Sequence, residues 1–267
     1  MKRLIDRFLQ ARNERSNENS EKLFFSSSGQ CPTCDQEVVF AAREAYLREH
    51  LICSNCSSLP RERALMVVID QFFPKWRESV VHETSPAPRG ASIKLANMCN
   101  KYVPSRYFES HPPGTFVNGM RCENLEALSF DDESIDLHVS QDVVEHIFHP
   151  KQAFREIART LKPGGMHIFS VPIVNKDKPS ARRARIENGQ IKHLVPAQYH
   201  GDGFGGPKSL VTFDWGYDIC RHIFDACGLF THIIHIDDVS KGIRADLIEI
   251  LVTVKPASAG SNVASQI

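Results

Sequence analysis

The chain has 267 residues, which allows one or two domains at about 150 residues each. Its 32 Lys and Arg balance its 32 Asp and Glu, and this zero net charge argues against a dedicated nucleic-acid binder, which is usually basic. With 42% hydrophobic and 24% charged residues, the composition is globular. No apolar run approaches the about 20 residues of a membrane span, and charges interrupt the apolar N-terminus, so we expect a cytoplasmic protein.

Residues 1–28 form the first predicted segment, a helix followed by a linker. Apolar residues at helical spacing (Leu4, Ile5, Phe8 and Leu9) predict a short amphipathic helix. The small polar stretch 26–29 predicts a linker or turn into the next unit.

Residues 29–60 carry two Cys-x-x-Cys pairs, Cys31 with Cys34 and Cys53 with Cys56, and 18 residues separate the pairs. This spacing is typical of a four-cysteine zinc site. A disulfide framework would need an oxidising compartment, and two pairs at this distance are better explained together than as a redox motif. Four sulfur ligands leave no open position for a substrate, so the predicted Zn²⁺ is structural.

Residues 61–78 predict a connecting helix, with an apolar face and Pro74 at its end. From residue 79 onward, strands alternate with helices. We expect strands at 79–83, 102–108, 117–122, 135–140 and 166–171, and helices at 92–100 and 150–161. This alternation predicts an α/β fold with a doubly wound parallel sheet.

The region 173–212 interrupts this alternation. Its length predicts a functional insertion, and it is rich in glycine and in basic residues (Lys176, Lys178, Arg182, Arg183, Arg185, Lys192 and Lys208). A helix at 217–227 and two strands at 230–236 and 247–254, expected as an antiparallel edge pair, complete the domain. The small, polar residues 257–267 predict a disordered tail.

Two segments, 128–146 and 154–165, carry a resemblance to a known family. They are similar to the class I S-adenosylmethionine-dependent methyltransferases, in the broad group of type 11-like methyltransferase domains. The resemblance implies a seven-stranded Rossmann-like methyltransferase sheet over residues 79–256. The whole arrangement also resembles bacterial proteins in which a zinc ribbon precedes this domain, and which are often linked to cell-surface glycan synthesis.

The resemblance implies cofactor contacts from two loops. After the third strand of the family's sheet, Glu123, Asn124 and Leu125 lie where the family places an aspartate on the adenine amino group, and the Asn124 carbonyl can accept that hydrogen bond. After the fourth strand, Gln141 and Asp142 would lie along the methionine part of the cofactor and face the substrate.

Two departures from the family pattern concern the same cofactor. The glycine-rich loop is replaced by the stretch Glu83–Gly90, which keeps the acidic residue and one glycine, while Thr84 and Ser85 offer hydroxyl groups. At the end of the second strand the family has an acid for the ribose hydroxyls, and here Ser105 and Arg106 stand there instead.

Methyl transfer from a sulfonium asks the protein mainly to align nucleophile, methyl group and sulfur. A hydroxyl acceptor also needs a base, and we expect the catalytic residues among His146, His200 and Asp142. The predicted function is S-adenosylmethionine-dependent methylation, at oxygen, of a small-molecule or glycan-like acceptor, which the basic insertion would allow to be anionic. The sequence does not indicate the oligomeric state.

Two other functions remain open. One is a non-catalytic zinc-ribbon adaptor that uses the sheet domain as a platform. The other is a nucleic-acid methyltransferase, against which the zero net charge and the missing Asn/Asp-Pro-Pro-Tyr motif weigh. In addition, Asp142-x-x-Glu145-His146 resembles the metal-binding triplet of some quinone-pathway O-methyltransferases, the alternative being that Glu145 and His146 pack or cap the following helix.

Overall fold

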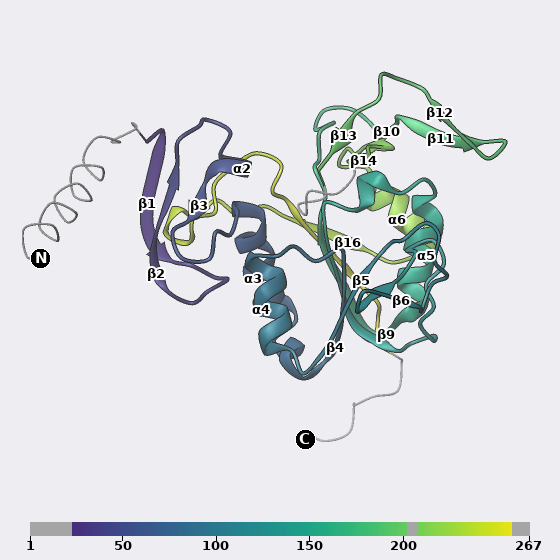
Figure 1. Cartoon of the computed structure of the whole chain (residues 1–267), viewed down its shortest axis with the longest axis horizontal. Helices are drawn as coiled ribbons and strands as arrows, with labels where there is room; N and C mark the ends of the chain where they lie inside the picture. The colour runs from purple at the N-terminus through teal and green to yellow at the C-terminus, as the bar shows by residue number, and fades with distance from the viewer. Residues whose placement is uncertain (1–22, 202–207, 258–267) are drawn as a thin grey trace, which may run out of the picture.

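The computed structural model describes residues 23–201 and 208–257. The predicted N-terminal amphipathic helix lies outside these ranges, as does nearly all of the predicted tail. Among the described helices, none is long and apolar enough to cross a bilayer. A large mixed sheet forms the centre of the molecule (Figure 1).

The sheet has eight strands, one more than the seven predicted, because the strand expected at 117–122 forms two; their order is β16-β17-β9-β8-β4-β5-β7-β6. Its five central strands, from β9 to β7, run parallel, while β17 is antiparallel to both β9 and β16. The predicted parallel sheet and its antiparallel edge pair are therefore confirmed. The strands are β4 (Val80–Thr84), β5 (Lys101–Arg106), β6 (Phe116–Val117), β7 (Met120–Cys122), β8 (Ile135–Gln141), β9 (Leu161–Ser170), β16 (Thr231–Ile234) and β17 (Ile250–Val254).

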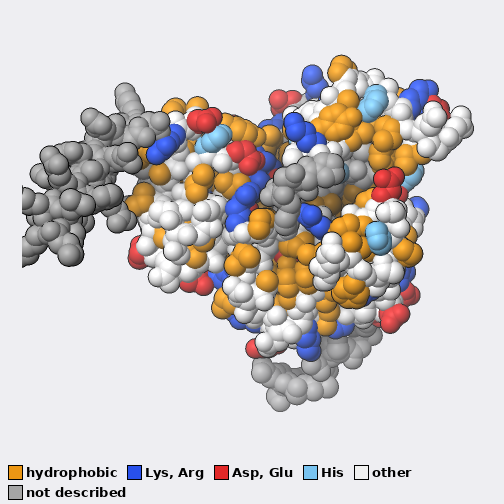
Figure 2. All heavy atoms as spheres, in the orientation of Figure 1, with side chains coloured by type: hydrophobic (Ala, Val, Ile, Leu, Met, Phe, Trp, Pro, Cys, Tyr) orange, Lys and Arg blue, Asp and Glu red, His pale blue; other side chains and the backbone are white. Residues whose placement is uncertain are grey.

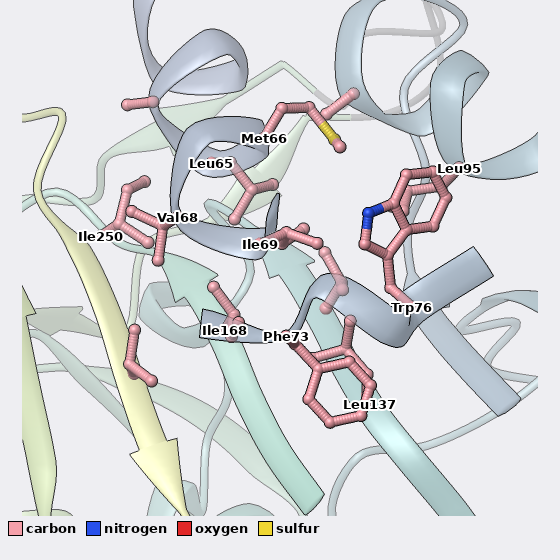
Figure 3. Close-up of a cluster of buried hydrophobic side chains, with 14 of the residues drawn as sticks. Leu65, Met66, Val68, Ile69, Phe73, Trp76, Leu95, Leu137, Ile168 and Ile250 are labelled. Atoms are coloured by element: carbon pink, nitrogen blue, oxygen red, sulfur yellow. The ribbon is translucent and has the colours of Figure 1, made fainter. Parts of the chain in front are cut away.

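Helices cover both faces of this sheet (Figure 1). On one face lie α3 (Pro60–Phe72) and α4 (Gly90–Met98), and on the other lie α5 (Pro150–Thr160) and α6 (Ile219–Cys227). The main core lies between α3 and the middle strands, where Leu65, Val68 and Ile69 pack with Leu137 and Ile168 (Figure 3). The described residues also contain three short 3₁₀ helices: η1 (Pro74–Glu78), η2 (Val144–His146) and η3 (Val239–Lys241).

The N-terminal unit is a three-stranded antiparallel sheet with one short helix. It comprises β1 (Phe25–Gln30), β2 (Glu37–Ala42), α2 (Leu47–His50) and β3 (Ile52–Cys53). The prediction of a linker at 26–29 was wrong, because these residues form β1 and pair with β2. Their small side chains permit close packing on η3: a Cβ at Gly29 would lie 1.9 Å from the Ser240 carbonyl oxygen.

Two predicted strands differ from the observed ones by more than a few residues at their ends. The expected strand at 117–122 is a hairpin of β6 and β7, turned at Asn118 and Gly119, which both have positive φ as an Asn-Gly hairpin turn requires. The strand expected to begin at Met166 begins at Leu161, because a register shift in its pairing with β8 accommodates Pro163–Gly165.

The insertion forms three two-stranded ribbons beside the carboxyl ends of the parallel strands. Thr212, at its end, fixes it to the turn after β8: the Thr212 N–H donates to the Glu145 carbonyl at 2.7 Å, and its hydroxyl donates to the Ile147 carbonyl at 2.7 Å. The ribbons pair β10 (Ala181–Arg182) with β15 (Phe213–Asp214), β11 (Ala184–Glu187) with β12 (Gln190–His193), and β13 (Tyr199–His200) with β14 (Ser209–Leu210).

Three histidines cross the buried centre of the sheet on neighbouring strands. His82 on β4 is paired in register with His138 on β8, which is paired with His167 on β9. The Nδ1 atoms of His82 and His138 lie 2.8 Å apart, and the outer nitrogens contact the hydroxyls of Ser105 and Thr160. All three rings are buried, and burial lowers their pKa values, to about 3 for His82 and His167.

Candidate functional site

A buried polar network joins the carboxyl ends of β4 and β8. The Glu83 carboxylate accepts hydrogen bonds from the Ser92 hydroxyl at 2.6 Å, the Tyr102 hydroxyl at 2.6 Å and the Gln141 amide at 3.1 Å. Burial raises the pKa of Glu83, and these hydrogen bonds oppose that rise. Two of the predicted cofactor residues, Glu83 and Gln141, are thus brought together at the strand ends, where open α/β sheets bind ligands.

The loop after β4 is held against α3. Ser85 adopts a positive φ of 54°, and its N–H donates to the Ser105 carbonyl at 2.8 Å. Gly90 has a φ of 56°, and a Cβ there would lie 2.2 Å from the Glu62 carboxylate, which also receives a hydrogen bond from Arg89. The glycine retained in this loop is therefore required by its contact with α3.

Of the residues predicted for adenine and ribose, several side chains have partners within the protein. The Asn124 side-chain carbonyl accepts from the Glu126 N–H at 2.9 Å, and the Glu123 carboxylate accepts from Arg121 and Ser129. Leu125 packs in a hydrophobic cluster, and the Thr84 side chain is buried. Ser105 is fully buried on His82, so its hydroxyl is committed to the interior of the sheet.

Asp142 forms an ion-pair cluster that includes the N-terminal unit. Its carboxylate lies 2.6 Å from Arg48 Nη2 and 3.0 Å from Arg61 Nε, and it accepts a hydrogen bond from the Ser170 hydroxyl at 3.0 Å. Burial alone would raise the pKa of Asp142, but the two guanidinium charges hold it at about 2. A carboxylate this acidic and doubly paired is a poor general base, which weighs against a role for Asp142 in proton transfer.

Arg48 and Arg61 are site residues that sequence reasoning missed. Arg48 also donates to the Leu247 carbonyl at 2.9 Å, and both arginines pair with Glu49, so the cluster joins the N-terminal unit to the sheet domain. Figure 2 shows basic and acidic side chains adjoining in the middle of the view, where the two parts meet. The sequence offered only one hint, the position of Arg61 shortly after the last cysteine pair.

The two predicted histidines lie together after β8, next to a buried carboxylate. His146 and His200 pack edge to face with ring centroids 5.3 Å apart. One nitrogen of each ring, His146 Nε2 and His200 Nδ1, lies 3.7 Å from Glu145 Oε1. The sequence placed His146 near the site, and the fold of the insertion brings His200 beside it across 54 residues of chain.

The four cysteines of the N-terminal unit gather as the spacing predicts. Their sulfur atoms all lie within 4.8 Å of one another, with Cys31 to Cys56 at 3.8 Å and Cys34 to Cys53 at 4.0 Å. Tetrahedral zinc with bonds of about 2.3 Å places its sulfurs about 3.8 Å apart, so this arrangement fits a zinc ion. None of the four forms a disulfide.

The basic stretch of the insertion carries less free charge than its sequence suggests. Lys176 pairs with Glu249, Arg183 with Asp214, and both Arg185 and Lys192 with Glu187. These partners reduce what the stretch offers to an anionic acceptor. Two cavities, of about 350 and 390 Å³, both border the N-terminal unit, and neither lies at the carboxyl ends of the parallel strands.

Comparison with known proteins identifies a family segment. Residues 92–169, from α4 through β9, match the family described as a methyltransferase domain. An uncharacterized methyltransferase of Mycobacterium tuberculosis is 40% identical over 61 residues, which cover 23% of this chain and 22% of that protein. A ubiquinone biosynthesis O-methyltransferase of Roseobacter denitrificans is 25% identical over 132 residues, 49% of this chain and 50% of that protein. The chain thus spans half or less of these curated relatives.

Solved structures with a similar chain trace include two methyltransferases. An S-adenosylmethionine-dependent methyltransferase from Mesorhizobium loti shares 13% identity and a TM-score of 0.44, covering 72% of this chain and 97% of that one. A 1,6-didemethyltoxoflavin-N1-methyltransferase from Burkholderia thailandensis, solved with S-adenosylhomocysteine, shares 10% identity and a TM-score of 0.46, covering 73% and 78%. The observed strand order supports the Rossmann-like sheet that the sequence predicts. The family match over residues 92–169 supports a methyltransferase domain within that sheet.

Proposed function

We propose that the chain is an S-adenosylmethionine-dependent methyltransferase. The observation that carries this proposal is the coincidence of the methyltransferase-family segment, residues 92–169, with the centre of a Rossmann-like sheet. Two predicted cofactor residues, Glu83 and Gln141, meet at the carboxyl ends of the strands in this region. The cofactor carries its own leaving group, so the chain has to bind it, orient the acceptor in line and exclude water.

The proposed acceptor is a small molecule or a glycan-like molecule, methylated at oxygen. The ubiquinone O-methyltransferases among the relatives support the choice of oxygen. His146 and His200 support it as well, because their imidazoles stand beside the strand ends, where a hydroxyl acceptor would need a base or a bound metal ion to lose its proton. The internal ion pairs of the insertion favour a neutral acceptor over a strongly anionic one.

Glu83→Gln should weaken S-adenosylmethionine binding at least tenfold. The neutral amide removes the charge on which the Ser92, Tyr102 and Gln141 donors converge, and so loosens the ends of β4 and β8 together. Calorimetric titration with S-adenosylmethionine and S-adenosylhomocysteine measures the affinity. Glu187→Gln, at a carboxylate on the insertion whose side chain is 41% exposed, is the matched control and should leave the affinity unchanged. Tyr102→Phe removes one donor only and should weaken binding less.

One result of that titration would contradict the proposed activity, and one result of a separate nucleic-acid binding assay would contradict the proposed acceptor. The first is wild-type protein that binds neither ligand up to millimolar concentrations, which would favour the non-catalytic adaptor. The anchoring of the loop after β4 on Glu62 is the observation that keeps this second function in view. The second is salt-sensitive binding of nucleic acid with no binding of the free acceptor class, which would revive a nucleic-acid methyltransferase.

We also propose that the four cysteines of the N-terminal unit hold a structural Zn²⁺. Modifying the thiols with a mercurial should then release zinc from the wild-type protein, detected with a metallochromic indicator. Cys34→Ser should abolish this release, because three sulfurs hold the ion much less tightly. Cys220→Ser, a half-buried cysteine on α6, is the matched control and should release zinc normally. Zinc release that persists in Cys34→Ser would refute this assignment.

A further inference from the structure

Glu145 is a buried carboxylate without a hydrogen-bond donor. Its side chain is 3% exposed, and neither oxygen has a partner among the residues that the structure describes. A buried ionised carboxylate is costly unless it is paired or coordinates a cation. The position is also rigid, because the backbone carbonyl of Glu145 accepts two hydrogen bonds from Thr212, at 2.7 and 3.0 Å.

The two neighbouring histidines lie beyond hydrogen-bond distance from the Glu145 carboxylate, at the spacing of ligands that share one ion. His146 Nε2 and His200 Nδ1 are each 3.7 Å from Glu145 Oε1, which is too long for a hydrogen bond. Ligand atoms about 2.1 Å from a tetrahedral ion lie about 3.4 Å apart. One ligand atom from each of the three residues falls within 4.8 Å of the other two, and so a single ion can reach all three.

The second nitrogen of His146 fixes how its ring faces the carboxylate. His146 Nδ1 lies 2.9 Å from the Leu210 carbonyl, which can only accept, so Nδ1 carries a proton; in the neutral ring Nε2 then presents a lone pair toward Glu145. Two acceptors facing each other repel unless a proton or a metal cation lies between them. Metal-binding histidines characteristically donate their other N–H to a backbone carbonyl in this way.

His200 completes the set from the insertion. Its Nδ1 faces Glu145 Oε1 at 3.7 Å, and its Nε2 lies 3.3 Å from the amide nitrogen of Gln198. Asp142, by contrast, is bound to Arg48 and Arg61 and takes no part. The group present here therefore differs from the Asp142-Glu145-His146 triplet that the sequence suggests.

We propose that Glu145, His146 and His200 form a binding site for a divalent transition metal of the zinc type. Two imidazoles and one carboxylate are a donor set that zinc favours, and three protein ligands leave a coordination position open. The ion would fasten the insertion, through His200, to the turn after β8. This proposal stands on the geometry of the three residues and does not depend on methyl transfer.

Cobalt titration of the tag-free, metal-depleted full chain tests the proposal, because Co²⁺ reports its ligands by absorbance. The four-cysteine site gives thiolate charge-transfer bands in the near ultraviolet, and we expect a second equivalent of Co²⁺ to add only weaker visible bands. His200→Asn, at a side chain 36% exposed, should weaken this second equivalent at least tenfold and leave the thiolate bands intact. Glu145→Gln should do the same.

His193→Asn is the matched control, since this exposed histidine lies on the same insertion. The His193→Asn protein should bind both equivalents of Co²⁺ with the affinity and the spectrum of the wild type. Saturation of the wild type at one equivalent, with the thiolate spectrum alone, would overturn the proposal. So would a second equivalent that binds equally well to the His200→Asn and Glu145→Gln proteins.

Discussion

Lowering the pH from 7.5 to 5 should reduce the free energy of unfolding by about 4 kcal/mol. His82 and His167 are buried as neutral rings, with pKa values of about 3 against 6.5 for an exposed histidine. Burial is the main cause, and the Arg121 charge adds to it for His82. At pH 5 the unfolded chain binds protons that the folded chain cannot, which costs about 2 kcal/mol for each ring.

The sign and window of this effect follow from those pKa values. The stability from the neutral rings is fully present above pH 6.5 and falls as the pH drops toward 3. His138, whose pKa is also lowered by burial, adds to the loss. Glu83 opposes it, because its raised pKa makes the folded chain take up a proton first. Asp142, with a pKa of about 2, begins to matter only below pH 4.

Urea unfolding at a series of pH values measures this prediction. His167→Asn should flatten the dependence of stability on pH by about one ring's share, because one titrating group is gone. His193→Asn, at an exposed site on the insertion, should leave the dependence unchanged. A free energy of unfolding that is constant between pH 7.5 and 5 would contradict the assignment of neutral buried rings.

Asp142→Asn should destabilise the chain by about 3 kcal/mol. Removing this charge leaves the Arg48 and Arg61 side chains, only 8% and 12% exposed, without their most buried acidic partner. Losing one member of a buried ion pair is costly because the remaining charge is poorly solvated. Urea unfolding at pH 7.5 measures the loss.

Glu49→Gln is the matched control for this second prediction. Glu49 pairs with the same two arginines at 2.7 and 2.8 Å, but its side chain is 37% exposed. An exposed pair contributes about 0–1 kcal/mol, so this variant should stay close to the wild type. Equal destabilisation by the two variants would show that the arginines do not depend on Asp142 in particular.

The elements with clear periodicity could be predicted from the sequence. The apolar stripe of α5 and the alternating pattern of β8 each follow from local spacing, and so do the parallel sheet and its antiparallel edge. The two Cys-x-x-Cys pairs predicted the cysteine cluster, because two such pairs at this spacing are typical of a four-cysteine zinc site. The Asn118-Gly119 pair is also a sequence signal, because Asn-Gly between short strands predicts the hairpin turn that joins β6 and β7.

The contacts of the candidate site could not be predicted in the same way. No local pattern says that Arg48 reaches Asp142, 94 residues away in the chain, or that Glu62 fills the space beside Gly90. The Glu145–His200 contact likewise depends on how a 40-residue insertion returns to the sheet. Long-range polar contacts are set by packing of whole elements, and their spacing along the chain carries no periodic signal.

The packing of the N-terminal unit on η3 has a consequence for synthesis on the ribosome. The Ser27 hydroxyl donates to the Val239 carbonyl, 212 residues later, and the Arg63 guanidinium donates to the Gly242 carbonyl. The segment that covers β1 therefore leaves the ribosome about 10 to 40 s after the residues it covers, at usual elongation rates. Until then β1 lacks the segment against which it packs. The N-terminal unit can therefore reach its final position only after nearly the whole sheet domain has been translated.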